Sequence, residues 1–199
     1  MKLFIQSILL TIVFTVLTGL LYPLVVTGVA QLAFHDQANG SLLVRDGTVV
    51  GSELLAQQFT GDKYFWPRPS AGGYATVPSG ASNLGPTSQA LQSNVTANAA
   101  AFRTGNKLAA DAPVPADMVF TSASGLDPHI SPEAARLQVA RVAAARSMGA
   151  DQVKTLVERF VEQPQWGIFG EARVNVLRLN LALDELDAKK AEGIPATKG

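Results

Sequence analysis

The sequence predicts a single N-terminal transmembrane helix followed by one mixed α/β (α+β) soluble domain. Residues 3–34 contain no Asp, Glu, Lys, Arg or His, whereas residues 35–199 carry 15 basic and 16 acidic side chains. Turn signals and amphipathic patterns alternate along this charged part, which is typical of a folded domain. We expect three regions: residues 1–34 with the membrane helix at about 5–30, a soluble extracytoplasmic domain over 35–187, and a flexible tail over 188–199.

The apolar segment is long enough to cross a bilayer. Residues 3–34 include 22 hydrophobic side chains, and as a helix they would extend about 48 Å, whereas a span needs about 20 residues. Pro23 predicts a kink or a loosening of the helix. Two alternatives stay open at this point. One is a cleaved signal peptide ending near Gly28-Val29-Ala30, although its apolar region would be about 7–15 residues. The other is a buried helix of a soluble protein.

One face of this helix is lined by small and hydroxylated residues. At 100° per residue, six of them fall within about 120° of one another. Such a face lets another helix approach closely in lipid, so we expect it to contact a helix of another chain; alternatively, the hydroxyl groups only bond their own backbone. Lys2 and the terminal amine favour a cytoplasmic N-terminus and an outward domain. The six residues are Ser7, Thr11, Thr15, Thr18, Gly19 and Tyr22.

The segment after the membrane helix predicts a hairpin and then a loop. Asp46-Gly47 lies between two short apolar runs, which is a hairpin signal. We expect a short helix over 52–59 capped by Ser52. Residues 64–90 contain 13 Gly, Pro, Ser or Asn among 27 residues, yet also carry aromatic side chains. Such a loop is pinned to its domain or docked to a partner.

The second half of the chain reads mainly as helices. We expect helices over 88–103, 131–148 and 151–162, a short strand over 118–121, and a helix rather than a strand over 173–187. Ser131 caps the second of these helices and Gly149 ends it in a left-handed conformation. Its predicted packing face is Ala134, Leu137, Ala140, Ala144 and Met148. Arg136, Arg141 and Arg146 rotate by about 140° at each step, so they do not form one anion-binding face.

Composition and motifs exclude several functions. With 16 basic and 16 acidic residues, no positive field exists to bind nucleic acid. The absence of Cys removes thiol and iron–sulfur chemistry, and two His leave little for zinc. No phosphate-binding loop and no Asp-Lys-Thr-Gly phosphorylation motif occur. Ser122, Ser124, Asp127 and His129 could be imagined as a serine hydrolase set, but Gly and Pro around them favour a turn that leads into a capped helix.

Several motifs, in order along most of the chain, resemble the C subunit of the bacterial Kdp potassium-transporting ATPase. Tyr64-Phe65-Trp66-Pro67-Arg68-Pro69-Ser70-Ala71 is similar to a family motif, and Ser82-Asn83-Leu84-Gly85-Pro86 is similar to another, with Ala81 where the family has Gly. The longest similarity is Thr121-Ser122-Ala123-Ser124-Gly125-Leu126-Asp127-Pro128-His129-Ile130-Ser131-Pro132. Further similarities are 18–24 in the membrane segment, 37–43 beyond it, 114–115, and the two runs 174–177 and 179–184 near the C-terminus.

The resemblance implies a non-catalytic accessory subunit in the bacterial inner membrane, with its soluble domain on the outer side. Its partners would be a channel-like potassium-binding subunit, a P-type ATPase subunit and a very small membrane subunit. It implies no cofactor for this chain, while ATP and potassium are used by the complex. The alternative role is a catalytic chaperone that raises the ATP affinity of the ATPase subunit. Candidate partner contacts are Tyr64, Phe65, Arg68, Ser70, Asn83, Asp127 and His129.

Overall fold

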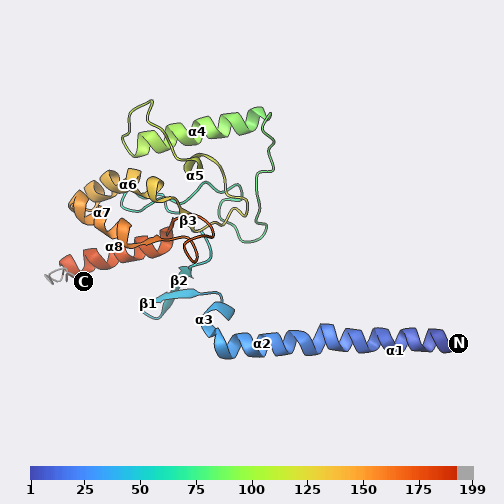
Figure 1. Cartoon of the computed structure of the whole chain (residues 1–199). Helices are drawn as coiled ribbons and strands as arrows, with labels where there is room; N and C mark the ends of the chain where they lie inside the picture. The colour runs from blue at the N-terminus through green and yellow to red at the C-terminus, as the bar shows by residue number, and fades with distance from the viewer. Residues whose placement is uncertain (192–199) are drawn as a thin grey trace. The chain divides into compact units, whose positions relative to one another are not determined.

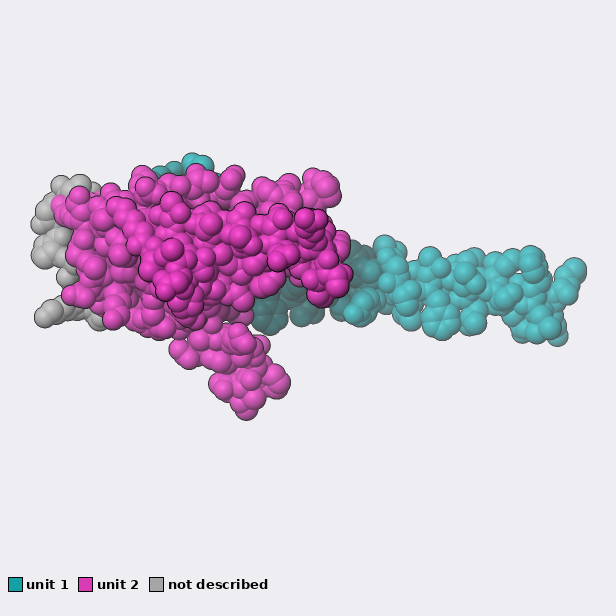
Figure 2. All heavy atoms as spheres, turned by 90° about the horizontal axis from the view of Figure 1, so that it is seen from above, with its two compact units in different colours: residues 1–52 teal, residues 53–199 magenta. Residues whose placement is uncertain are grey.

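A computed structural model describes residues 1–191 and divides the chain into two compact units, residues 1–52 and 53–199 (Figures 1 and 2). The division follows Ser52 rather than residue 34, because residues 35–52 have most of their contacts within the first unit. The last helix continues to Ala191. Four residues of the predicted 188–199 tail are therefore helical, and the rest of that tail lies outside the described residues.

The first unit contains one continuous apolar helix of 32 residues, Lys2–Ala33. It consists of α1 (Lys2–Val16), the π-helical turn η1 (Leu17–Leu21) and α2 (Tyr22–Ala33). Pro23 has no N–H to donate to the carbonyl four residues earlier. The turn before it widens, with the Tyr22 N–H bonded to the Leu17 carbonyl. The predicted loosening at Pro23 is confirmed. None of the helix's most apolar window is buried, so the interpretation as a buried soluble helix is wrong.

A short helix, α3 (His35–Ala38), and the predicted hairpin complete the first unit. Strands β1 (Leu42–Arg45) and β2 (Thr48–Ser52) pair in an antiparallel register. Asp46 and Gly47 both have positive φ, 51° and 74°, which is the backbone that a tight two-residue turn requires. The predicted helix over 52–59 is wrong. Ser52 belongs to β2, and its hydroxyl donates to the Gly40 carbonyl at 2.7 Å instead of capping a helix.

The second unit combines helices with one small sheet. Its elements are α4 (Gln89–Gly105), α5 (Ala116–Val119), β3 (His129–Ile130), α6 (Pro132–Ala145), α7 (Ala150–Arg159), β4 (Val161–Glu162), β5 (Arg173–Asn175) and α8 (Val176–Ala191). The strands are antiparallel in the order β3-β5-β4. The hydroxyl groups of Ser88 and Ser131 accept the capping bonds of α4 and α6, and the cap predicted at Ser131 is confirmed.

Three local predictions need correction. Residues 116–119 form the helical turn α5 instead of a strand, because the Phe120 N–H closes on the Ala116 carbonyl at 2.9 Å. Gly149 does not end α6 in a left-handed conformation. Ser147 takes that position with φ of 50°, and Gly149 is the extended residue before α7. The predicted 151–162 helix ends at Arg159, and β4 follows it.

The sequence of residues 173–187 is compatible with a strand or a helix, and the structure contains one of each. These residues begin as β5 and continue as α8. Asn175 makes the change possible, because its side-chain oxygen accepts the Arg178 N–H at 3.1 Å, as an N-cap does. The expectation of a helix is confirmed from Val176 onward and is wrong for the three residues before it.

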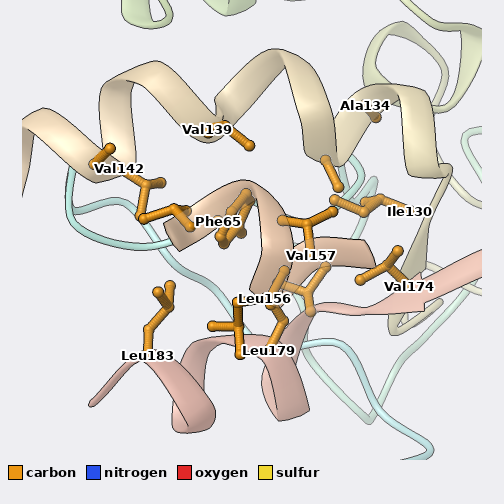
Figure 3. Packing of buried hydrophobic residues seen from close by; sticks show 14 of the residues in the cluster. Phe65, Ile130, Ala134, Val139, Val142, Leu156, Val157, Val174, Leu179 and Leu183 are labelled. Atoms are coloured by element: carbon orange, nitrogen blue, oxygen red, sulfur yellow. The ribbon is translucent and has the colours of Figure 1, made fainter. Parts of the chain in front are cut away.

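The hydrophobic core of the second unit lies among α6, α7, α8 and the sheet (Figure 3). Val142, Val157, Val174, Leu179 and Leu183 are fully buried there, and Phe65 enters from the loop before α4. The face predicted for α6 is partly wrong, because the Ala140 and Ala144 side chains are exposed. The buried face instead includes three polar side chains, Gln138, Arg141 and Arg146.

These polar side chains are buried because they bind the backbone of a loop, residues 62–66. We call Gln138, Arg141 and Asn180 the loop clamp. Asn180 accepts the Phe65 N–H at 2.8 Å and donates to the Phe65 carbonyl at 3.0 Å. Gln138 accepts the Trp66 N–H at 2.7 Å. Arg141 donates to the carbonyls of residues 62 and 64 at 2.6 and 2.9 Å.

Two arginines reinforce this arrangement. The Arg141 guanidinium lies 3.8 Å from the centre of the Trp66 ring, which is a stacking contact. Burial lowers the pKa of Arg141 to about 10, so it stays charged at neutral pH. Arg146 donates to the Lys63 carbonyl at 2.6 Å and pairs with Asp184 at 2.8 Å and with Asp187. Arg136, the third arginine of the series, pairs with Glu158 at 2.7 Å, so the three guanidinium groups bind different partners.

Replacing the clamp amide should destabilise the second unit. Asn180→Ala leaves the buried Phe65 N–H and carbonyl without partners, which costs about 2–4 kcal/mol for two groups. We expect urea unfolding of the full chain in detergent, followed by circular dichroism, to show that loss. Asn94→Ala, at an exposed position on α4, is the matched control. Equal stability of the two variants would contradict the role of the clamp.

Candidate functional site

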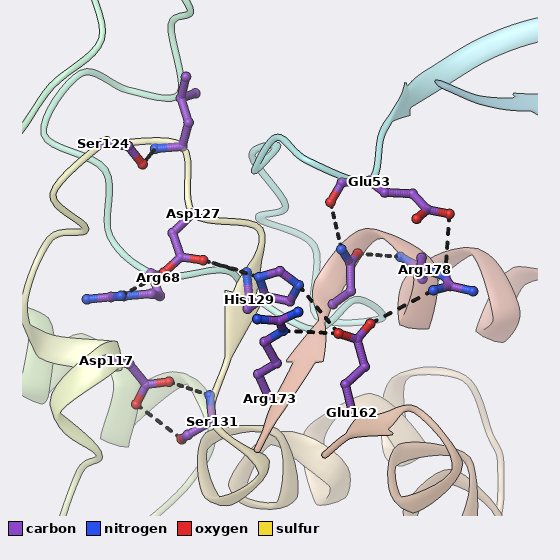
Figure 4. A network of polar contacts seen from close by, with 12 residues as sticks. Glu53, Arg68, Asp117, Ser124, Asp127, His129, Ser131, Glu162, Arg173 and Arg178 are labelled. Atoms are coloured by element: carbon purple, nitrogen blue, oxygen red, sulfur yellow. Dashed lines mark hydrogen bonds and ion pairs between the residues drawn. The ribbon is translucent and has the colours of Figure 1, made fainter. Parts of the chain in front are cut away.

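The candidate site is a chain of charged side chains that starts in the 64–71 motif and crosses the 121–132 motif (Figure 4). Arg68 donates to Asp127 at 2.8 Å. The other carboxylate oxygen of Asp127 accepts the His129 backbone N–H at 3.0 Å and lies 3.5 Å from His129 Nδ1. The second ring nitrogen of His129 lies 3.9 Å from Glu162. The imidazole is therefore held between two carboxylates.

The sheet positions the far end of this network. Glu162 on β4 stands opposite Arg173 on β5, and Arg173 donates to it at 3.0 Å. Arg178, in the first turn of α8, lies 3.9 Å from the other Glu162 oxygen and 3.7 Å from Glu53. The network therefore connects three sequence motifs and all three strands.

Asp127 is the electrostatic centre of the site. Burial alone would raise the pKa of its carboxyl group, but hydrogen bonds from His129 and Arg68 outweigh burial and lower that pKa to about 2. Asp127 is thus ionised at any physiological pH. A carboxylate of such low pKa is a poor general base, so its function here is to hold Arg68 and the turn at residues 127–129.

An open cleft of about 720 Å³ lies beside the network. Its lining includes Arg68, Asp127 and His129, together with Asp117, Glu133 and Arg173. Asp117 accepts both the backbone N–H and the hydroxyl of Ser131 at the start of α6 (Figure 4). A cleft with charges of both signs suits a polar protein surface better than an apolar ligand. Among residues 1–191 no group of three or more His, Asp or Glu side chains is arranged to hold a metal ion.

The structure brings some of the predicted contact residues together and separates others. Arg68, Asp127 and His129 meet, and Ser70 joins them by donating to the Gly125 carbonyl at 2.7 Å. Tyr64 points elsewhere, with its hydroxyl 3.3 Å from Asp184 on α8.

Two further candidates lie apart from the network. Phe65 is completely buried, which corrects the expectation that its side chain contacts a partner: the loop clamp turns it into the core. Asn83 is exposed, with a left-handed φ of 52°.

The serine hydrolase alternative is wrong. Both ring nitrogens of His129 face carboxylates. The Ser124 hydroxyl accepts the Leu126 N–H at 3.1 Å within its own turn, and Figure 4 draws no contact between it and His129. A serine hydrolase needs a hydrogen bond between the serine hydroxyl and a histidine ring nitrogen. The interpretation of this segment as a turn is therefore the correct one.

Comparison with known proteins identifies the family. The family model described as "K+-transporting ATPase, c chain" matches residues 4–185. Potassium-transporting ATPase KdpC subunits are similar over nearly their whole length. That of Nitratidesulfovibrio vulgaris is 53% identical over 94% of this chain and 96% of its own. That of Rhodospirillum rubrum is 56% identical over 86% and 89%, and that of Mycobacterium tuberculosis is 53% identical over 90% and 96%.

The chain belongs to the KdpC family. The match includes the apolar helix from residue 4 onward as well as the second unit. A KdpC-family chain is a subunit of a potassium-transporting ATPase rather than a catalytic protein by itself. The resemblance inferred from the sequence motifs is thereby confirmed, and the 64–71 and 121–132 motifs contact each other through Arg68 and Asp127.

The membrane helix of this KdpC-family chain has its hydroxyl groups satisfied internally. Thr11, Thr15 and Thr18 each donate to the carbonyl four residues earlier, at 2.6–2.8 Å, and Ser7 donates to Leu3 and Phe4. No atom lies within 4 Å of a Cβ placed on Gly19. Apart from the exposed Tyr22, the face therefore presents small side chains to a neighbouring helix, and the hydroxyl protons of Ser7, Thr11, Thr15 and Thr18 are already used.

The sequence analysis did not identify the part of the network that lies beyond His129. Glu162, Arg173, Arg178 and Glu53 were not singled out, because β4 and β5 have two and three residues and such short strands show no periodicity. A usable signal was present in two charged residues of this C-terminal stretch: Arg173 directly precedes the 174–177 motif, and Arg178 stands between it and the 179–184 motif.

Removing the Asp127 charge should alter the pH dependence of stability. The folded-state pKa of about 2 lies below the ordinary 3.8. Ionised Asp127 therefore stabilises the fold above pH 3.8, and this contribution is lost as the pH falls through 2. For a partly exposed group we expect Asp127→Asn to lose on the order of 1 kcal/mol of unfolding free energy at pH 6, and this difference from the wild type to shrink as the pH falls toward 2.

The measurement is urea unfolding of the full chain in detergent at a series of pH values. Asp111→Asn is the control, because Asp111 is exposed. A difference between the Asp127 variant and the wild type that does not change between pH 6 and pH 2 would rule out the charge as its cause.

Proposed function

We propose that this chain is a non-catalytic accessory subunit that assembles or stabilises an ATP-driven potassium importer. Its partners would be a channel-like potassium-binding subunit, a P-type ATPase subunit and a small membrane subunit, and ATP and potassium would be used by the complex. The observation that carries the proposal is the 32-residue apolar helix, none of whose most apolar window is buried among the described residues. A single span with a face of small residues finds its packing partner on another chain.

The soluble unit supports the same proposal. In the 64–71 and 121–132 motifs, the side chains of Arg68, Ser70 and Asp127 bind one another or backbone groups. These bonds give the loops a fixed shape, which a binding surface needs. Side chains held in this way are not free to act as catalytic acids or bases. We propose Arg68, Ser70, Asp127 and His129 as support for a partner surface beside the cleft, and exposed Asn83 as a direct contact.

We propose that the second unit lies outside the cytoplasmic membrane. Lys2 and the terminal amine favour a cytoplasmic N-terminus, and Arg45 is the one Lys or Arg in the 15 residues after the span. An outward unit cannot touch cytoplasmic ATP. The alternative role, a chaperone that raises ATP affinity, would then operate only as a coupling free energy transmitted through other subunits.

Protease access in intact spheroplasts tests the orientation. With a tag at the C-terminus, we expect added protease to remove the tagged second unit while a cytoplasmic marker protein stays intact. Protection until the cells are lysed would place the unit beside the ATPase machinery. The direct nucleotide-chaperone role would then replace our proposal.

The small-residue face of the helix is tested by added volume. Thr15→Leu with Gly19→Leu fills the face, and we expect recovery of the large subunits with a tagged chain to fall several-fold, since close helix approach is blocked. Val13→Phe is the matched control, because residue 13 lies about 200° around the helix from Thr15. Unchanged recovery with the double variant would show that this face is not an interface.

A further inference from the structure

Within the connection between β4 and β5, residues 163–170 form a tight turn held by its own backbone. The Gln165 and Phe169 residues exchange both of their backbone hydrogen bonds, at 2.8 and 3.0 Å. The Gly167 N–H donates to the Pro164 carbonyl at 2.8 Å. Trp166 and Gly167 take positive φ values of 55° and 75°. The loop therefore has a defined shape without support from the core.

Its tip presents large apolar side chains to solvent. Trp166, Ile168 and Phe169 are 82%, 78% and 59% exposed. The two aromatic rings are 5.9 Å apart, at 75° to each other, so they form one edge-to-face unit. Single exposed apolar residues are ordinary, but three within a four-residue turn form a patch that marks an interaction site. None of the three belongs to the hydrophobic core.

We propose that Trp166, Ile168 and Phe169 form an anchor that inserts into an apolar pocket on another subunit of the potassium-transporting complex. This inference rests on the proposed accessory function, because it needs a partner on the same side of the membrane. Trp and other aromatic residues dominate the binding energy of protein interfaces. A turn that is already rigid loses little entropy on binding.

The charges around the tip favour a protein partner over the lipid surface. The 163–170 loop contains no Lys or Arg. Glu162 and Glu171 flank it, and the nearest cation, Arg173, is paired with Glu162. Loops that bind anionic lipid carry basic residues beside their apolar tip. An apolar centre with a polar and acidic rim instead fits a pocket bordered by Lys, Arg or amide groups.

The first test is co-purification of the whole complex from membranes with a tagged chain. We expect Trp166→Ser with Phe169→Ser to reduce recovery of the large subunits about tenfold, and Trp166→Phe to retain most of it. Val77→Ser is the matched control, because Val77 is an apolar residue of the same unit and is 88% exposed. Full recovery with the double Ser variant would overturn the inference.

The second test does not depend on how the Ser variant folds. A photoreactive benzophenone amino acid at position 168 of the otherwise wild-type chain should crosslink to another protein subunit. Crosslinking to lipid alone, or to no partner in the purified complex, would overturn the inference. If the wild-type chain itself fails to recover the large subunits, the proposed function fails; if it recovers them and position 168 does not crosslink to protein, only this inference fails.

Discussion

The backbone of residues 62–66 is the constraint on which the second unit depends. A loop that enters a core must find partners for its N–H and carbonyl groups, because buried unpaired groups are costly. Within residues 1–191 no strand pairs with this loop, and side chains of α6 and α8 bind its backbone groups instead. Asn180 alone pairs with both polar groups of Phe65. The clamp thus allows an apolar side chain from an irregular loop to complete a helical core.

The candidate site follows from the same constraint. Once Phe65 and Trp66 are fixed, the chain leads within two residues to Arg68, which reaches Asp127. Asp127 in turn holds the backbone of His129 at the start of β3. The site is therefore an extension of the core packing, which explains why motifs about 50 residues apart in the sequence converge. Their charged residues set the shape of two loops rather than react.

The sequence was informative where local chemistry decides and misleading where tertiary contacts decide. The membrane helix, the Asp46-Gly47 hairpin and the Ser131 cap follow from short-range rules, and all three are confirmed. The packing face of α6 was misassigned because Arg141 and Gln138 look like surface residues until the loop that binds them is known. Sheet pairs such as Glu162 with Arg173 were out of reach for the same reason.

The internal pairing of the motif residues limits how this chain could influence the ATP-driven step. A subunit shifts a partner's equilibrium only by the difference between its contacts in the two states. Side chains locked into their own fold, such as Asp127 with a pKa of about 2, offer little that could change. Any such difference must therefore come from surfaces that the fold leaves unused: the small-residue face of the membrane helix and the exposed loops. A coupling of tenfold in affinity needs only about 1.4 kcal/mol from those surfaces.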